Sequence, residues 1–328
     1  MRHLITGGAG FIGSHLAELL LQQGDEVTVL DDLSSGKREN IEYLESKSSF
    51  RLVVGSALDG SVLKGLISSA DVVYHLAASV GVLRLLKEPV HVMHNNIGAV
   101  QSVLRAIDES GSSGCKIVFA SSSEVYGELK EHPSREDDSL EFPAPTDTRW
   151  SYRISKAVGE SMCLAYARER KMRVVVVRLF NTIGPRQNAD RGPVVPRLVT
   201  QAVNGKPMTI FGDGRQTRSF ASVREVVDAI SRLAKDDRTD GEIFNVGANQ
   251  EISILELADK IRLLAKSDSP IEFHPYEEVC GAGFVDVRRR VPDLTKLERV
   301  LGTRMPLELD ETLADIVRSH QHVRHARP

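Results

Sequence analysis

The sequence predicts an α/β fold, a doubly wound parallel sheet with helices on both faces and a smaller, interleaved C-terminal lobe. Over the first 180 residues, short β-branched runs alternate with longer stretches of helical spacing, the pattern of parallel strands joined by helices. A glycine-rich turn directly follows the first of these runs. After residue 180 the alternation fades, and glycine, proline and asparagine become frequent.

The first strand and the first helix are clearly marked. Residues 3–6 are typical of a buried strand, and residues 11–23 place large apolar side chains on one helical face. Gly24 follows at the position of a C-cap. The apolar face consists of Ile12, Leu16, Leu19 and Leu20.

The other elements of the sheet follow in alternation. Further strands are expected at 26–30, 50–54, 72–75, 116–120 and 173–178, and helices near 62–67, 91–108 and 152–170. Right-handed crossovers between such units give a doubly wound sheet. We place the first domain at residues 1–180 and the second lobe at residues 181–328, with segments near 220–248 returning to the first domain.

Length and composition limit the class of protein. At about 150 residues per domain, 328 residues allow two domains. The apolar share of 41% and the charged share of 27% exclude a disordered or collagen-like chain. A net charge of −3 argues against a general nucleic-acid or membrane binder. No apolar stretch approaches the roughly 18 residues that span a bilayer.

Cysteine usage and the chain ends suggest where the protein works. Cys115, Cys163 and Cys280 lie far apart without a CxxC pair, so we expect neither a disulfide framework nor a metal site. A strand begins almost at Met1, which leaves no room for a signal peptide. We therefore expect a cytoplasmic protein, whose histidine-rich tail at 319–328 is a solvated helix end.

The glycine-rich turn has the spacing of a phosphate cradle. Gly7 allows a tight turn, Gly10 allows a pyrophosphate to approach the backbone, and Gly13 allows the helix to pack closely on the strand. Phe11 and Ile12 open the helix, whose N-terminus attracts an anion. We expect these five residues to bind a dinucleotide in a Rossmann-type sheet.

Two aspartates at the end of the second strand indicate which dinucleotide is bound. Asp31 and Asp32 stand about 20 residues after the glycines, where a carboxylate accepts hydrogen bonds from the adenosine ribose and repels a 2′-phosphate. Asp31 is the better candidate because it directly follows the strand. NAD is therefore favoured, and NADP stays open because Lys37 and Arg38 are close in sequence.

Three residues have the spacing of a proton-transfer site. Ser122 follows a predicted strand, and Tyr152 and Lys156 open a predicted helix, four residues apart. This spacing puts Tyr152 and Lys156 on one helical face, where the ammonium stabilises the phenolate and lowers the tyrosine pKa. Both segments follow the carboxyl ends of parallel strands, where open α/β sheets bind ligands.

With the GxxGxxG turn, this triad and the run His-Leu-Ala-Ala at residues 75–78, the chain resembles the extended short-chain dehydrogenase/reductase family, in particular its nucleotide-sugar epimerases, dehydratases and decarboxylases. The resemblance implies a resident NAD that oxidises C4 of the sugar. It implies that Tyr152 takes the hydroxyl proton, that Ser122 hydrogen-bonds the same oxygen and that Lys156 also holds the nicotinamide ribose. Further implied cofactor contacts are Ser56, Ala57, Leu76, Ala77, Ala78 and Asn96.

The residues after the catalytic serine indicate which reaction follows. The resemblance implies an Asp-Glu pair in a 4,6-dehydratase, whereas Ser123 and Glu124 resemble the Thr-Ser-Glu of UDP-glucuronate decarboxylases. The stretch at 148–152 resembles the decarboxylase half of the bacterial enzyme that modifies lipid A with aminoarabinose. The stretch at 286–292 resembles the segment in which decarboxylases place an arginine beside the sugar carboxylate, here Arg290. Ser123, Glu124 and Arg290 therefore join the catalytic candidates.

Polar and cationic residues of the second lobe are expected to hold the substrate. Two phosphates and a carboxylate need cationic partners, and a guanidinium binds a carboxylate through two parallel hydrogen bonds. The three arginines at 288–290 leave open which one meets the substrate. The resemblance implies substrate contacts at Asn181 and Arg218. The apolar residues Val80 and Val195, and Arg197, Arg288 and Arg290, complete the expected set.

The leading functional hypothesis is decarboxylation of UDP-glucuronate to UDP-xylose or a UDP-4-keto-pentose. The alternatives are C4 epimerisation of a UDP-sugar of the glucuronate or glucose type, 4,6-dehydration of a nucleotide sugar and, outside catalysis, a dinucleotide-sensing protein. Retention of Ser122, Tyr152 and Lys156 argues against the sensor. By analogy we also expect a homodimer formed through the helices near 91–108 and 152–170, and neither a nucleic-acid nor a membrane partner.

Overall fold

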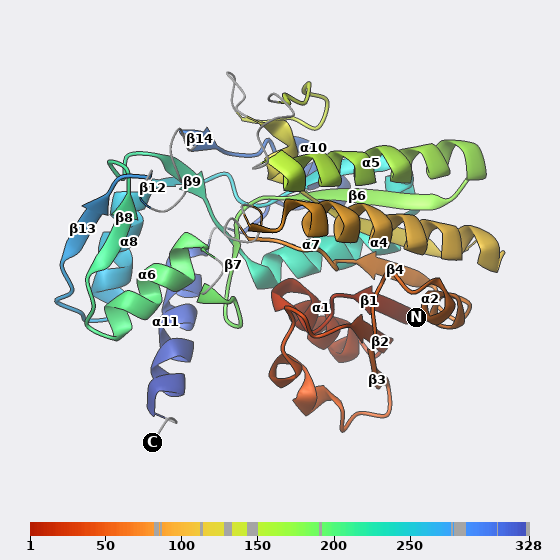
Figure 1. The fold of residues 1–328 in the computed structure, drawn as a ribbon, viewed down its shortest axis with the longest axis horizontal. Coiled ribbons are helices and arrows are strands. Elements are labelled where there is room, and N and C mark those ends of the chain that lie inside the picture. Colours follow the sequence, from red (N-terminus) through yellow and green to blue (C-terminus); the bar gives the residue numbers. More distant parts are fainter. Residues whose placement is uncertain are drawn as a thin grey trace.

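The centre of the molecule is a parallel sheet of seven strands in the order β11-β6-β5-β4-β1-β2-β3, which confirms the predicted α/β fold (Figure 1). The structure is a computed structural model, and it describes residues 1–81, 85, 87–111, 114–127, 133–142, 150–189, 192–276, 278, 287–306 and 308–325. The strands are β1 (Arg2–Thr6), β2 (Glu26–Asp31), β3 (Phe50–Val54), β4 (Val72–His75), β5 (Lys116–Ser122), β6 (Arg173–Leu179) and β11 (Glu242–Val246).

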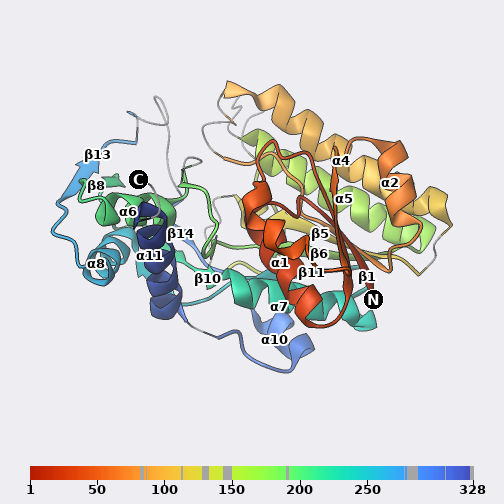
Figure 2. The same ribbon diagram turned by 90° about the horizontal axis from the view of Figure 1, so that it is seen from below.

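Helices cover both faces of this sheet (Figures 1 and 2). One face is covered by α1 (Phe11–Gln22) and α7 (Val223–Lys235). The other face is covered by α2 (Gly60–Ile67), α4 (Pro89–Ser110) and α5 (Ser151–Arg170). Helix α1 ends one residue earlier than predicted, because Gln23 is the C-cap and Gly24 follows with a φ of +83°.

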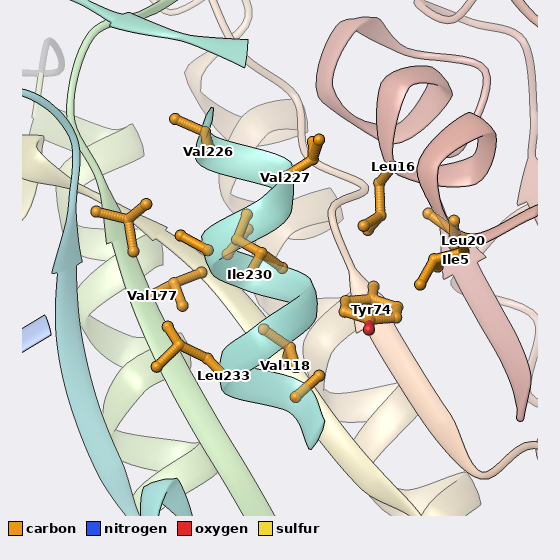
Figure 3. Packing of buried hydrophobic residues seen from close by; sticks show 14 of the residues in the cluster. Ile5, Leu16, Leu20, Tyr74, Val118, Val177, Val226, Val227, Ile230 and Leu233 are labelled. Atoms are coloured by element: carbon orange, nitrogen blue, oxygen red, sulfur yellow. The ribbon is translucent and has the colours of Figure 1, made fainter. Parts of the chain in front are cut away.

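The core beneath α7 shows why residues after 220 lie against the N-terminal sheet. A capping box of Ser222 and Glu225 starts the helix, and β11 then pairs with β6. The helix buries a continuous aliphatic face on the sheet, and each such side chain contributes roughly 1.5–3 kcal/mol. Its face consists of Val226, Val227, Ile230 and Leu233, and the facing side chains include Val118, Val177, Tyr74 and Leu16 (Figure 3).

The second lobe has its own apolar core. Its helices α6 (Val194–Val203), α8 (Ile254–Leu264) and α11 (Leu309–His325) pack around one cluster, and α10 (Thr295–Leu301) packs on α7 and β11. Its short strands are β7 (Thr182–Ile183), β8 (Met208–Phe211), β9 (Thr217–Ser219), β10 (Ala221–Ser222), β12 (Glu251–Ser253), β13 (Ile271–His274) and β14 (Arg289–Arg290). Short 3-10 helices are η1 (Arg38–Asn40), η2 (Glu42–Leu44), η3 (Ser123–Tyr126) and η6 (Asp237–Thr239).

Some sequence-based expectations fall outside the described residues, namely those on Cys280, on residues 148 and 149, and on residue 286. Among the helices that the structure describes, none combines the length and the apolar character needed to cross a bilayer. Within the same residues, no group of three or more His, Cys, Asp or Glu side chains is arranged to hold a metal ion. Cys115 and Cys163 are buried free thiols.

Candidate active site

A cavity of about 1670 Å³ lies between the sheet and the second lobe, at the carboxyl ends of β1, β4, β5 and β6. This is where open α/β sheets bind ligands. Every residue predicted to contact the cofactor lines it: Gly7, Gly10, Phe11, Ile12, Gly13, Asp31, Asp32, Ser56, Ala57, Leu76, Ala77, Ala78, Asn96, Tyr152 and Lys156. The other predicted residues that line it are Ser122, Glu124, Val80, Asn181, Arg197, Arg218 and Arg290.

The glycine turn is shaped for a pyrophosphate. Gly7 has a φ of +75°, and a Cβ there would lie 2.7 Å from the backbone nitrogen of Ala77. A Cβ on Gly13 would collide with the Gly7 carbonyl, so both positions exclude a side chain. Gly10 is the N-cap of α1, and the helix N-terminus with Phe11 and Ile12 faces the cavity. The cradle therefore offers backbone amides and a positive helix end to an anion.

Asp31 and Asp32 stand beside this cradle. Asp31 is buried, and its carboxylate accepts hydrogen bonds from the backbone amides of Ala9 and Leu33, each at 2.9 Å. Burial raises the pKa of Asp31. Asp32 accepts from the amide of Ser34 at 2.9 Å and is more exposed. Each carboxylate oxygen has a second lone pair for a ribose hydroxyl, so the pocket fits the adenosine half of NAD.

The three predicted proton-transfer residues come together at the end of β5. Ser122 is the last residue of β5 and lies within hydrogen-bonding reach of the Tyr152 hydroxyl. Tyr152 and Lys156 share one face of α5, and the Lys156 ammonium lies 5.9 Å from the Tyr152 ring centre. Lys156 is 3% exposed and donates to the Ala120 carbonyl at 2.6 Å. The four-residue interval in the sequence thus places Tyr152 and Lys156 on one helical face, as predicted.

Burial sets the ionisation of this pair. Desolvation lowers the pKa of Lys156 to about 8, with the nearby charge of Glu160 opposing that shift. Desolvation raises the pKa of Tyr152, and the hydrogen bond from Ser122 opposes the rise. A cation in the cavity, such as an oxidised nicotinamide, favours the phenolate form and so lowers the raised pKa of Tyr152.

Glu124 and Arg290 form an ion pair across the cavity wall. Burial raises the pKa of Glu124, but the charges of Arg290, Arg153 and Arg218 hold it below its usual value. Arg290 Nη1 donates to Glu124, and the buried Nε has no hydrogen-bond partner among the described residues. A guanidinium with an unused N–H donor can bind a second carboxylate.

The structure separates the three consecutive arginines. Arg290 pairs with Arg218 in the register of β14 and β9, and both line the cavity. Arg289 is exposed and forms a bidentate ion pair with Glu251. Arg288 contributes its backbone carbonyl to Thr217 at 3.0 Å, and its side chain is not in the lining. Of these three side chains, Arg290 alone lines the cavity.

Other predicted contacts divide into lining and supporting positions. Asn181 lines the cavity and donates to the Ser219 carbonyl at 3.0 Å. Arg197 lines it with its guanidinium 4.2 Å from the Phe211 ring centre. Val195 is buried in the apolar core of the second lobe, and Ser123 is buried within η3. Contrary to the prediction, neither residue lines the cavity. These two act at most through their neighbours.

The loop after β4 is fixed by buried polar groups. Asn96 accepts from the Ser79 amide at 2.7 Å and donates to the Ser155 hydroxyl at 3.1 Å, so it ties this loop to α5. Ser56 stands where the resembling family often has an aspartate, and it accepts from the Leu58 amide at 3.2 Å. It lines the cavity, so a hydroxyl is available there in place of a carboxylate.

Sequence reasoning missed several lining residues. Arg153 is buried with its guanidinium 3.4 Å from the Trp150 ring centre, and both residues line the cavity. A charged residue directly after the tyrosine, on a helix with a buried inner face, was the available signal. Phe211 and Tyr276 line the far end with ring centres 6.2 Å apart. They offer flat surfaces to a nucleotide base, but no motif marks them.

Comparison with known proteins gives a consistent result. The model of the NAD dependent epimerase/dehydratase family matches residues 3–247. A UDP-N-acetyl-alpha-D-glucosaminuronate decarboxylase from Bacillus cytotoxicus is 40% identical over 302 residues, with 91% of each chain covered. UDP-glucuronic acid decarboxylase 1 from Danio rerio is 34% identical over 95% of this chain and 71% of its own length.

Solved structures share the whole architecture. UDP-glucose 4-epimerase from Thermotoga maritima, solved with UDP-glucose, superimposes with a TM-score of 0.88 and 29% identity over 98% of this chain and 99% of that one. The dTDP-glucose 4,6-dehydratase DesIV from Streptomyces venezuelae, solved with NAD, gives a TM-score of 0.89 and 28% identity over 99% and 98%. The same sheet and second lobe therefore serve several named reactions.

Proposed function

Because the chain belongs to the NAD dependent epimerase/dehydratase family, we propose that it is a nucleotide-sugar decarboxylase that acts on a UDP-uronate. The observation that carries the proposal is Arg290, a half-buried cation that lines the cavity beside Glu124 and whose Nε has no hydrogen-bond partner among the described residues. A sugar whose C6 is a carboxylate supplies that partner. The names of two relatives, both decarboxylases of UDP-uronates, support the same reaction.

The first chemical step is oxidation at C4 of the sugar. Bound NAD supplies the hydride acceptor for this step and a hydride donor for any later reduction. The glycine cradle and Asp31 hold the dinucleotide beside β5. Tyr152 Oη, as the phenolate, accepts the proton of the C4 hydroxyl, and Ser122 Oγ hydrogen-bonds the same oxygen. The Lys156 ammonium keeps the phenolate available near neutral pH.

The second step breaks the bond between C5 and C6. With C4 a ketone, the carboxylate is β to a carbonyl, so the electron pair of the breaking bond delocalises onto the C4 oxygen and carbon dioxide leaves. Tyr152, now protonated, and Ser122 hydrogen-bond that oxygen and stabilise its negative charge. A proton delivered to C5 restores the ketone. Arg290 orients the carboxylate for this cleavage, and Glu124 holds Arg290 before the substrate arrives.

Two uronates are candidate substrates. UDP-glucuronate is the one expected from the sequence, and the relative from Danio rerio is named for it. The Bacillus cytotoxicus relative, which matches at higher identity and covers both chains almost equally, is named for the N-acetylated uronate. We therefore propose UDP-N-acetylglucosaminuronate as a second substrate to be tested in parallel.

C4 epimerisation is the second candidate function. It needs only the oxidation step performed by Ser122, Tyr152 and Lys156, followed by return of hydride to the other face of the ketone. The likeness to the Thermotoga maritima epimerase favours it. A cation beside C6 favours a uronate substrate in either reaction, so loss or retention of the carboxylate decides between decarboxylation and epimerisation.

The experiment incubates purified protein and NAD with each uronate and with UDP-glucose. Decarboxylation predicts release of carbon dioxide from a uronate and a nucleotide pentose product by mass spectrometry. A C4 epimer that retains its carboxylate would replace this proposal by the epimerase. Absence of turnover with every UDP-sugar would remove both functions.

We also propose that the protein works as a homodimer formed through α4 and α5. Ile97 on α4 and Ile154 and Met162 on α5 are only partly buried, although they are apolar. Sedimentation equilibrium measures the oligomeric state, and charged substitutions at Ile97 and Ile154 are expected to give a monomer. The cytoplasmic location stays a prediction from the sequence.

A further inference from the structure

A buried ion pair lies directly behind the proton-transfer residues. Glu160 of α5 and Arg178 of β6 are each 3% exposed and are joined by two hydrogen bonds, Arg178 Nε to Glu160 Oε1 at 3.0 Å and Nη2 to Oε2 at 2.8 Å. Removing two charges from water is costly and is compensated only by good geometry and additional hydrogen bonds. The pair does not line the cavity. Its other contacts therefore show what it does.

The first set of contacts fixes the end of β5 against α5. Ser121 donates to Glu160 Oε1 at 2.5 Å, and Lys156 donates to the Ala120 carbonyl at 2.6 Å. Tyr152, Lys156 and Glu160 follow one another at intervals of four on the same helix. The last three residues of β5 thus each meet one residue of this helical row, because Ser122 reaches Tyr152.

The second set of contacts leads from Arg178 to the η3 turn. The guanidinium lies 4.6 Å from the ring centre of Tyr126, which ends η3, the turn that also carries Glu124. Tyr126 donates its hydroxyl hydrogen to Asn245 Oδ1 at 2.7 Å. Arg178 and Asn245 are partners in the register of β6 and β11. One buried row therefore crosses β5, β6 and β11.

The third set continues to the segment that follows Arg290. Asn245 Nδ2 donates to the carbonyls of Ser134 at 2.9 Å and Asp293 at 3.3 Å. The Ser134 amide donates to the Val291 carbonyl at 2.9 Å. An unbroken series of hydrogen bonds and ring contacts thus joins the proton-transfer residues to the residue after Arg290.

We propose that Glu160 and Arg178 are positioning residues, which hold the proton-transfer residues Ser122, Tyr152 and Lys156 and the Glu124–Arg290 pair in one fixed arrangement. They touch neither sugar nor cofactor and act through Ser121, Tyr126 and Asn245. The inference deepens the proposed function and rests on it for the role of Arg290. The part of the inference that concerns Ser122 and Lys156 applies to oxidation at C4, a step that every candidate reaction of the fold shares.

The charge of Glu160 gives the inference a readout that a purely structural role lacks. The carboxylate favours the ammonium form of Lys156. As a negative charge on the same helical face, it is also expected to disfavour a second negative charge on Tyr152. The other ionisable groups that face Lys156 are His75 on β4 and Tyr152 and Cys163 on α5, and Tyr152 also faces Glu124 of η3. None of these is altered when Glu160 is changed. Loss of the Glu160 charge therefore shifts both titrations toward lower pH.

The test compares Glu160→Gln, Ser121→Ala and the control Asp240→Asn. Asp240 pairs with Lys116 at 2.7 Å, at the opposite end of β5, so its variant also removes the acid partner of a buried cation. In the presence of NAD, tyrosinate absorbance is titrated for each protein against the same protein carrying Tyr152→Phe. The rate of C4 oxidation is followed as reduction of bound NAD by a UDP-sugar.

In Glu160→Gln we expect the tyrosinate titration to move down by about half a pH unit or more, and the oxidation rate to fall at least about tenfold. Ser121→Ala keeps every charge, so its titration is expected to stay in place while the rate falls several-fold. Asp240→Asn is expected to lower the melting temperature and change neither readout.

The inference is overturned if Glu160→Gln behaves like Asp240→Asn, with lower stability but an unmoved titration and an unchanged rate. If Glu160→Gln does not fold, the rate of C4 oxidation in Ser121→Ala is the test. A wild-type rate in Ser121→Ala overturns the inference. The titration needs no sugar. If no UDP-sugar reduces bound NAD, the proposed function fails. An unmoved tyrosinate titration in Glu160→Gln overturns the positioning role independently of that result.

Discussion

The two sides of the cavity are built in different ways. The cofactor side is formed by short stretches of contiguous sequence, above all the turn from Gly7 to Gly13, and it presents backbone amides. The substrate side is formed by side chains from segments far apart in sequence, such as Glu124, Arg218 and Arg290. Backbone shape therefore determines the first side, and charge brought together by the fold determines the second.

The difference teaches where specificity resides. A cradle of backbone atoms is shared by proteins with different reactions, as the neighbours named as an epimerase and a dehydratase show. We propose that the charged side chains on the opposite wall distinguish one sugar from another. Substitutions on the cofactor side should consequently affect every substrate equally, and substitution of Arg290 on the other side should affect uronates selectively.

The largest effect is expected at Tyr152, where the two sides meet. Tyr152→Phe removes the acceptor of the C4 proton, and loss of a general base lowers turnover by about 10³-fold. NAD is expected to stay bound, because the cradle and Asp31 are untouched. Stopped-flow absorbance of bound NAD measures the oxidation step. Unchanged turnover in this variant would show that another group accepts the proton.

The next effect separates the sides most sharply. Arg290→Lys keeps a charge beside Glu124 but loses the fork that binds a carboxylate, so kcat/KM for a UDP-uronate is expected to fall about 100-fold, or ~2.7 kcal/mol. Oxidation of UDP-glucose should change less than threefold. Arg289→Lys is the matched control, because Arg289 is exposed and paired with Glu251. Equal losses on both sugars would mean that Arg290 does not hold a carboxylate.

The cofactor side is tested by a pair of glycines. Gly7 and Gly24 both have positive φ, but a Cβ on Gly7 would meet the Ala77 backbone, whereas a Cβ on Gly24 would meet nothing within 4 Å. Both alanine variants carry backbone strain of about 1–2 kcal/mol. Only Gly7→Ala is expected to weaken NAD binding as well, about tenfold in Kd by calorimetry. A normal NAD affinity in Gly7→Ala would contradict the cradle.

The smallest effect is a pH dependence. Burial lowers the pKa of Lys156 to about 8, so the ammonium is present below that pH and is lost as the pH rises through it. The oxidation rate of the free enzyme is therefore expected to decline above about pH 8 for every sugar. In Lys156→Arg the cation persists, and the residual rate should not show this decline. A decline seen only with uronates would place its origin on the substrate side.

The same contrast explains what could be predicted from sequence. The glycine spacing, Asp31 and the four-residue interval from Tyr152 to Lys156 are local patterns, and strand, turn and helix geometry converts them directly into a site. The parallel sheet and its cover of helices followed from the alternation of runs, whereas the strand order came from the structure. Patterns within short stretches of sequence were therefore enough to predict the fold class and most of the residues that line the cofactor side.

The substrate side depends on contacts that no local rule gives. The resemblance pointed to Arg290 but left the choice among three arginines open. The structure shows that Arg290, paired with Arg218 in the register of β14 and β9, lines the cavity, while Arg289 turns to Glu251. Arg153 and its stacking on Trp150 were likewise missed. Glu160 and Arg178 are separated by 18 residues and meet only because α5 packs across β5 and β6.

The central claim is that a uronate carboxylate in this cavity is lost as carbon dioxide after oxidation at C4. The most direct measurement gives the enzyme and NAD a UDP-uronate labelled in its carboxylate and counts the label in gas and in nucleotide sugar. The account predicts one labelled carbon dioxide for each sugar consumed, with Arg290→Lys slowing its release. Label retained in a C4-epimeric sugar, while bound NAD is still reduced, would contradict the account.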